Sequence, residues 1–255
     1  MMLVDVHAHL YTKQYKDDID EVIKRAENAG VKAIIAAGVD PDTNRRTLEL
    51  ADRYDIVKVA LGIYPPDALE KETNKKLSFD VDEELKFIES KKKEIIAISE
   101  FGLDYNYSNE NKKMQMEIFV KHLKLAKKIN KPIVVHSRKA EADVINILEN
   151  EKMKKVVLHC FCGKNKLVKK AIEQGWSFSI PTNIVKSQQF QDNVGIIPLP
   201  QLLTETDSPF LSPYQGMRNE PAFIAESVKK IALIKKIEAE EAANIIYSNY
   251  QKMFL

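Results

Sequence analysis

The sequence is poor in cysteine and has no long apolar run. Its 255 residues include only two cysteines, Cys160 and Cys162, which are too close in sequence to staple a fold. This pattern fits a reducing compartment. No apolar stretch reaches the ~20 residues that cross a bilayer, and no positively charged leader with a long apolar core is present. We therefore expect a cytoplasmic protein with no membrane contact.

An excess of charge of either sign is also missing. The 39 basic and 37 acidic residues leave a net charge of +2, so charge alone does not indicate a nucleic-acid partner. Lysine clusters within residues 91–93, 152–155 and 229–236 fall on expected helices or their ends, and we interpret them as solvated faces, with phosphate tracking as the alternative. No feature indicates an obligate protein partner.

A glycine-rich phosphate-binding turn is absent too, because G-x-G-x-x-G occurs nowhere in the chain. What the chain does contain is a regular alternation of apolar strands and amphipathic helices. The expected strands are residues 3–10, 31–38, 56–63, 94–100, 133–136, 156–159, 176–180 and 202–207. The expected helices are residues 17–29, 42–54, 80–91, 110–129, 140–150, 164–174, 187–193 and much of 221–255, with a loop through Pro65 and Pro66.

Eight such units predict an α/β protein in which residues 1–255 form a single (β/α)8 TIM barrel. An open doubly wound sheet is the alternative, and it would favour a glycine-rich turn after the first strand. That turn reads Leu10-Tyr11-Thr12-Lys13 instead. The closed barrel is therefore preferred.

The first expected strand carries polar residues at every second position. Asp5, His7 and His9 would share one face of it, because side chains alternate along a strand. Two imidazoles on a buried face are costly unless something binds them, and a divalent metal ion is one such partner. A pair of hydrogen-bonded core histidines is the alternative.

Further polar residues fall at the carboxyl ends of later strands, where barrel enzymes place their working groups. The candidate metal ligands are His7, His9, Glu100, His136, His159 and Asp207. The fifth histidine, His122, lies within an expected helix and is given no role. Six donors exceed what one tetrahedral ion needs, which indicates two ions sharing a carboxylate.

Glu100 is the expected bridge, because its strand lies between the two ligand groups in the barrel order. The first ion would be bound by His7, His9, Glu100 and Asp207, and the second by Glu100, His136 and His159. Nitrogen and oxygen ligands accept Zn²⁺, Mn²⁺ or, less readily with so many imidazoles, Mg²⁺.

Six motifs now reveal a resemblance to a known family. They are DVHAH (5–9), SEFGLD (99–104), PIVVHSR (132–138), HCF (159–161), ETDSP (205–209) and RNEP (218–221). In this order and spacing the chain resembles the TatD family of metal-dependent deoxyribonucleases, within the amidohydrolase-like barrels. The resemblance implies the same ligand set. It adds hydrolysis of phosphodiester bonds in DNA, often as an exonuclease, with single-stranded DNA or duplex ends as the expected substrate.

Two ions about 3.5–4 Å apart suit this chemistry, since they hold a phosphate oxygen, generate hydroxide and stabilise the leaving oxygen. Glu100 and Asp207 are then the expected catalytic groups, with Asp207 taking the proton from the attacking water. Arg138 is expected to pair with a substrate phosphate. Asp5 and Glu205 lie two residues before ligands and are expected to accept the free N–H of ligating imidazoles.

Arg218 stands in the RNEP motif beyond the last strand. It is read either as a substrate contact or as part of a loop-to-helix junction anchored by Pro221. Both readings stay open.

The chain also departs from the family pattern at four positions. Tyr64 and Pro66 stand where histidines are usual, so we expect the Tyr64 hydroxyl or ring to contact substrate instead, the ring by stacking on a base. Cys162 replaces a serine, as a plain thiol or as a thiolate that captures a soft metal. Met217 replaces a common lysine.

Two other functions remain in view. The same metal site could act on another ester or amide, such as a lactone, a cyclic amide or an aminoacyl-ester, because fold does not choose between these reactions. A nucleic-acid-binding barrel without catalysis is the third possibility, and the intact ligand set argues against it.

Overall fold

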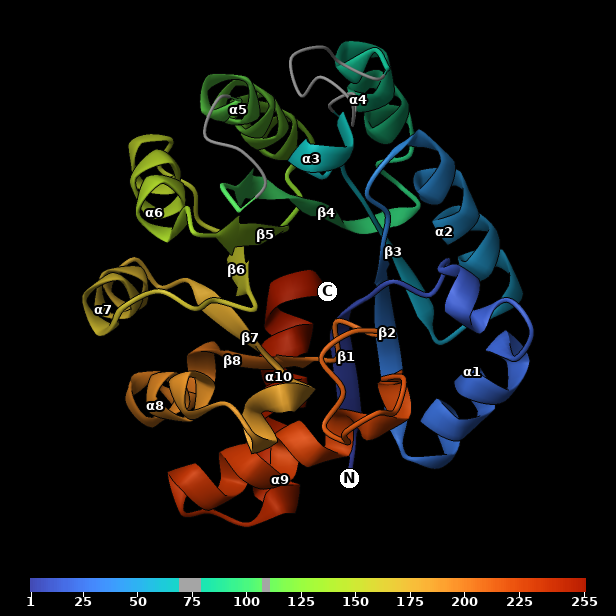
Figure 1. The fold of residues 1–255 in the computed structure, drawn as a ribbon, viewed down its shortest axis with the longest axis vertical. Coiled ribbons are helices and arrows are strands. Elements are labelled where there is room, and N and C mark those ends of the chain that lie inside the picture. The colour runs from blue at the N-terminus through green and yellow to red at the C-terminus, as the bar shows by residue number, and fades with distance from the viewer. Residues whose placement is uncertain (69–78, 107–110) are drawn as a thin grey trace.

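Eight parallel strands form one sheet in the order β1 to β8, which confirms the predicted barrel. The computed structural model describes residues 1–68, 79–106 and 111–255 (Figure 1). The strands are β1 (Leu3–Ala8), β2 (Val31–Ala37), β3 (Val57–Leu61), β4 (Ile95–Asp104), β5 (Ile133–Arg138), β6 (Val156–His159), β7 (Ser177–Pro181) and β8 (Leu202–Glu205).

Helices follow the strands, and in Figure 1 most of them form a ring outside the strands, whereas the last helix runs into the middle of the view. They are α1 (Ile19–Asn28), α2 (Pro41–Arg53), α3 (Pro65–Ala68), α4 (Val81–Ser90), α5 (Lys112–Ile129), α6 (Glu141–Asn150), α7 (Asn165–Glu173), α8 (Gln188–Ile196), α9 (Ile224–Lys235) and α10 (Ala239–Phe254). Short 3-10 turns are η1 (Lys13–Tyr15), η2 (Thr182–Val185), η3 (Leu199–Gln201) and η4 (Pro221–Phe223).

Burial explains the alternation. In α1, Ile19, Val22 and Ile23 are buried against the sheet, which is the apolar stripe of an amphipathic helix. In β2, six of the seven residues are buried, as expected of a strand covered by helices on one face and by the barrel interior on the other. The core therefore lies between the sheet and the helix ring and inside the barrel.

The segment at Pro65 and Pro66 corrects one sequence-based expectation. It forms the short helix α3 rather than a loop. Proline is well suited to the first turn of a helix because its fixed φ is helical and its missing N–H would have no partner there. The backbone N–H of Ala68 closes the turn on the carbonyl of Tyr64 at 3.2 Å.

Strand β4 is longer than expected. The prediction ended it at Glu100, but it continues to Asp104 and pairs with β5 from Phe101↔Val135 to Asp104↔Arg138. Gly102 makes the close approach possible, because a Cβ there would lie 2.0 Å from the carbonyl oxygen of His136. Its φ of +152° is also one that side-chain-bearing residues rarely adopt. This close pairing sets the distance between Glu100 and His136.

Between β1 and β8 the barrel is joined by scattered bonds. The Thr204 hydroxyl donates to the carbonyl of Val4 at 2.8 Å, and the backbone N–H of Asp207 donates to the carbonyl of His7 at 2.9 Å. The backbone N–H of His9 donates to the carbonyl of Ser208 at 2.8 Å. These contacts carry the first and the last polar motifs of the chain to the same rim.

Across residues 1–68, 79–106 and 111–255, the search for a helix with the length and apolarity of a membrane span finds none.

Candidate metal centre

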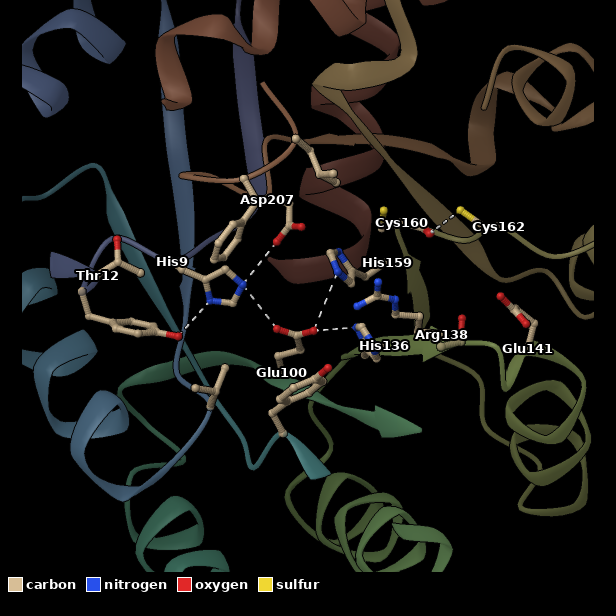
Figure 2. Close-up of a pocket in the computed structure, with 16 residues that line it drawn as sticks. His9, Thr12, Glu100, His136, Arg138, Glu141, His159, Cys160, Cys162 and Asp207 are labelled. Carbon is tan, nitrogen blue, oxygen red and sulfur yellow. Dashed lines mark hydrogen bonds and ion pairs between the residues drawn. The ribbon is translucent and has the colours of Figure 1, made fainter. Parts of the chain in front are cut away.

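A cavity of about 610 Å³ opens at the carboxyl ends of the strands. Its walls come from both ends of the chain and from the middle strands (Figure 2). The lining includes His9, Tyr11, Thr12, Tyr64, Glu100, His136, Arg138, Glu141, His159, Cys160, Cys162, Asp207 and Phe210. His7 lies beneath this surface and is completely buried.

The two histidines of β1 point their Nε2 atoms at two carboxylates. Nε2 of His7 lies 3.5 Å from Glu100 Oε2 and 3.7 Å from Asp207 Oδ1. Nε2 of His9 lies 3.3 and 3.2 Å from the same two oxygens. The two nitrogens are themselves 3.3 Å apart. Four donor atoms from β1, β4 and the end of β8 therefore surround one small volume.

The second oxygen of Glu100 faces another pair of imidazoles. Oε1 lies 2.8 Å from Nδ1 of His136 and 3.8 Å from Nε2 of His159. In Figure 2 the Glu100 carboxylate lies between His9 on one side and His136 and His159 on the other. Glu100 thus contacts all four histidines of the rim.

Each of these imidazoles has a partner for its outer ring nitrogen. Nδ1 of His7 lies 3.3 Å from the Ser99 hydroxyl, and Nδ1 of His9 lies 3.1 Å from the hydroxyl of Tyr11. Carboxylates serve the other two rings. Nε2 of His136 lies 3.1 Å from Asp104 Oδ2, and Nδ1 of His159 lies 2.8 Å from Glu205 Oε2. A carboxylate in this position accepts the N–H of the ring, which frees the inward nitrogen to bind a metal ion.

Glu205 and Asp5, both expected to accept an imidazole N–H, have different contacts. Glu205 faces His159 and also accepts the Ser179 hydroxyl at 2.5 Å. Asp5 instead accepts the backbone N–H groups of His7 at 3.2 Å and Thr206 at 2.9 Å. The expectation for Asp5 is wrong because its carboxylate lies one level deeper in the barrel, where it reaches the backbone that joins β1 to β8.

Electrostatics keep the two central carboxylates charged. Burial alone would raise the pKa of Glu100, but hydrogen bonds from His136, His7 and His9 hold it well below the usual value. Burial alone would also raise the pKa of Asp207, but the hydrogen bond from His9 and the charges of His159, His9 and His7 together lower it. The deeper Glu205 lacks this compensation, and burial raises its pKa to about 8. The anionic pair therefore lies where the histidine nitrogens converge.

This donor set fits divalent ions. Nitrogen lone pairs and carboxylate oxygens are the ligands that Zn²⁺ and Mn²⁺ accept. Within the described part of the chain, two groups of three residues hold ligand atoms that all lie within 4.8 Å of one another. They are His7, His9 and Asp207, and His7, Glu100 and His159. His136 belongs to neither group, but its Nδ1 touches the Glu100 oxygen that faces His159.

The three expected substrate contacts lie in different places. Arg138 is exposed at the end of β5 and lines the cavity. Tyr64 also lines it, and its hydroxyl donates to Asp104 at 2.5 Å. Arg218 is not among the lining residues and forms an ion pair with Asp18 at 2.6 Å. Its placement favours the loop-to-helix junction over the substrate contact.

Sequence reasoning missed Asp104. It lies four residues after Glu100 on the same strand, and strand alternation would have put both on one face. The signal was hidden because β4 was expected to end at Glu100. Tyr11 and Ser99 were also missed, and nothing in their local sequence marks a hydroxyl that meets an imidazole.

Besides Tyr64, three positions depart from the family pattern, and the structure places each of them. Cys162 is a free thiol at the cavity wall. Pro66 lies in α3, and Met217 is 55% exposed on the loop after β8. None of these residues takes the place of a candidate ligand.

Comparison with known proteins gives one consistent result. The family model described as TatD related DNase matches residues 4–255. The chain is 35% identical to the metal-dependent hydrolase YabD of Bacillus subtilis, over 99% of both chains. It is also 35% identical to human deoxyribonuclease TATDN3, over 99% of this chain and 94% of that protein. The crystal structure of YjjV, a TatD homologue from Escherichia coli, superposes with a TM-score of 0.88 at 25% identity, covering 99% and 97% of the chains.

Proposed function

Because the chain belongs to the TatD family and is a metal-dependent hydrolase of that family, we propose that it cleaves phosphodiester bonds in DNA with two divalent ions. The relative named a deoxyribonuclease supports the choice of substrate. The cytoplasmic location expected from the reduced cysteines is part of the same proposal.

The position of Glu100 carries the proposal for two ions. Its Oε2 faces the Nε2 atoms of His7 and His9 at 3.5 and 3.3 Å, and its Oε1 faces His136 at 2.8 Å. A carboxylate whose two oxygens meet separate sets of nitrogen donors has the arrangement of a bridging ligand. His7, His9 and Asp207 would complete one ion, and His136 and His159 the other.

When bound, two such ions polarise the phosphate, lower the pKa of water and stabilise the leaving oxygen. The protein groups supply the remaining steps. Asp207 reaches the cavity beside His9, where it accepts the proton of the attacking water. Arg138 on the opposite wall binds a non-bridging phosphate oxygen through its planar guanidinium. Asp104 and Glu205 hold the His136 and His159 rings in position.

Cleavage of single-stranded DNA by chelator-treated protein tests the proposal. We expect no cleavage without added metal, cleavage with Mn²⁺, Mg²⁺ or Zn²⁺, and loss of at least about a hundredfold in rate for Glu100→Gln. Glu149→Gln makes the same chemical change on α6, where Glu149 pairs with Lys170 outside the cavity, and it should keep full activity.

Two outcomes would contradict the assignment. Rapid turnover of a lactone, cyclic amide or aminoacyl-ester with no DNA cleavage would reassign the same metal centre to another ester or amide. DNA binding without turnover under any divalent metal would instead indicate a barrel that has lost catalysis.

A further inference from the structure

A second groove adjoins the metal centre. It has a volume of about 230 Å³, and Tyr11 and Thr12 line both it and the main cavity. Figure 2 shows Thr12 beyond His9, on the opposite side of Glu100 from Arg138. The groove runs between residues 10–19 and helix α2. A substrate chain that extends from the metal centre past His9 would therefore enter it.

The lining of this groove combines an apolar floor with a cationic rim. Leu10, Tyr15, Ile19 and Leu50 are buried and form the floor. The charged lining residues are Lys16, Arg46, Arg53 and Glu49, which gives three cations against one carboxylate. Two of the cations also face carboxylates outside the lining, because Arg46 lies 3.6 Å from Asp42 and Arg53 lies 3.5 Å from Asp20.

The three cations differ in the hydrogen bonds and ion pairs that they form with neighbouring groups. Arg46 donates to the carbonyl of Tyr11 at 2.6 Å and thereby fixes the wall between the two cavities. Arg53 lies 3.5 Å from Asp20, whose side chain is 73% exposed, and such exposed pairs contribute little. Lys16 is exposed beside them. Lys16 and Arg53 therefore both lie at the exposed rim, where Arg53 would exchange its contacts with Asp20 and with the Tyr54 hydroxyl, at 2.8 Å, for an incoming anion.

We propose that this groove binds the sugar-phosphate backbone of the substrate strand next to the nucleotide being cleaved. The proposal rests on the proposed function for its substrate, and it adds that the substrate is a strand several nucleotides long. Lys16 and Arg53 bind phosphates, and the apolar floor accepts the faces of sugars or bases. A mononucleotide ester would fill the metal centre only, whereas an oligonucleotide would fill both cavities.

The test compares substrates of two lengths with a charge-matched control. Lys16→Ala/Arg53→Ala removes two charges from the groove. Lys154→Ala/Lys155→Ala removes two exposed charges from the segment before β6, at the opposite end of the barrel. For an oligonucleotide of about twelve residues, the groove variant should raise KM by about tenfold and lower the slope of log KM against log salt by about 1.4, while the control changes neither.

For a dinucleotide, the expected rise in KM in the groove variant is less than a third of that for the oligonucleotide. An equal rise for both lengths, or an equal effect of the control, would overturn the proposal. Binding of a fluorescent oligonucleotide to Glu100→Gln protein, with and without the groove substitutions, separates this result from the proposed function. If no DNA is cleaved but the groove substitutions alone weaken binding, the groove stands and the catalytic proposal fails.

Discussion

At the scale of single residues, the four imidazoles of the rim differ in the partner behind them. His7 and His9 are backed by neutral hydroxyls, whereas His136 and His159 are backed by the carboxylates Asp104 and Glu205. A charged carboxylate behind an imidazole raises the basicity of the ring and its affinity for a metal. The pKa of Asp104 lies below its usual value, whereas burial raises that of Glu205 to about 8, so Asp104 is the charged one of the two at neutral pH. Binding of the second proposed ion by His136 and His159 should therefore depend strongly on Asp104, which the sequence alone did not single out.

Asp104→Asn tests this dependence. The amide keeps the size of the side chain but removes the charge that faces Nε2 of His136. We expect the affinity for the ion bound by His136 and His159 to fall about 10–100-fold, with a smaller change for the other ion. Titration of chelator-treated protein with Mn²⁺, followed by calorimetry, measures both affinities.

The control for this substitution is Asp143→Asn. Asp143 accepts the Tyr105 hydroxyl at 2.8 Å, outside the residues that line the cavity. It should leave both affinities unchanged. Equal Mn²⁺ affinities in wild type and Asp104→Asn would show that Asp104 does not support His136 as a ligand.

At the scale of elements, the alternation of strands and helices could be predicted because each has its own apolar period. The expected helix at residues 110–129 corresponds to α5, which buries Ile118, Phe119 and Leu123. The end of β4 could not be predicted, since the strand continues past Glu100 by pairing with residues of β5 that lie 34 positions later in the chain, beginning with Phe101↔Val135. Local pattern carries no information about that pairing.

His122 shows the same limit. The sequence predicted no role for this histidine of α5. In the structure it is fully buried and stacks on Phe101 of β4, with ring centroids 4.7 Å apart. Its Nδ1–H donates to the Ile118 carbonyl at 2.8 Å. Burial lowers the pKa of His122 to about 4, so the ring is neutral in the folded protein at neutral pH.

The pH dependence of stability follows from this pKa. Between about pH 4 and 6.5 the unfolded chain binds a proton at His122 that the folded protein does not, so the free energy of unfolding rises with pH over that range. Over the whole range, this one group raises the free energy of unfolding by about 3 kcal/mol. We expect His122→Leu to remove this part of the pH dependence, as measured by urea unfolding at several pH values.

Leu123→Met on the same helix is the control for a change in packing. It should shift the free energy of unfolding by a similar amount at every pH, because it removes no titrating group. If the difference between wild type and His122→Leu is the same at pH 4.5 and pH 7, the pKa of His122 is not lowered in the folded state.

At the scale of the whole molecule, the sequence predicted the barrel and the meeting of distant motifs because parallel strands bring their carboxyl ends to one rim. It could not predict how the loop after β8 folds. Asn219 in that loop donates its amide to Thr182, Thr206 and Phe210, at 2.8, 2.8 and 2.6 Å, and Arg218 turns outward to Asp18. These contacts depend on residues up to 200 positions apart.

The candidate ligands come from β1, β4, β5, β6 and the segment after β8, so ion binding should stabilise the whole barrel. Each ion binds the folded chain and not the dispersed ligands of the unfolded one. At a free concentration a hundredfold above Kd, an ion contributes about 2.7 kcal/mol, which for a domain of this size raises Tm by roughly 5–10 °C. Calorimetry of chelator-treated protein, before and after addition of Mn²⁺ or Zn²⁺, measures the rise.

Glu100→Gln should melt with little dependence on the ion, whereas Glu149→Gln should behave as wild type. A similar rise in Tm for Glu100→Gln would mean that the ions stabilise the barrel from some other site.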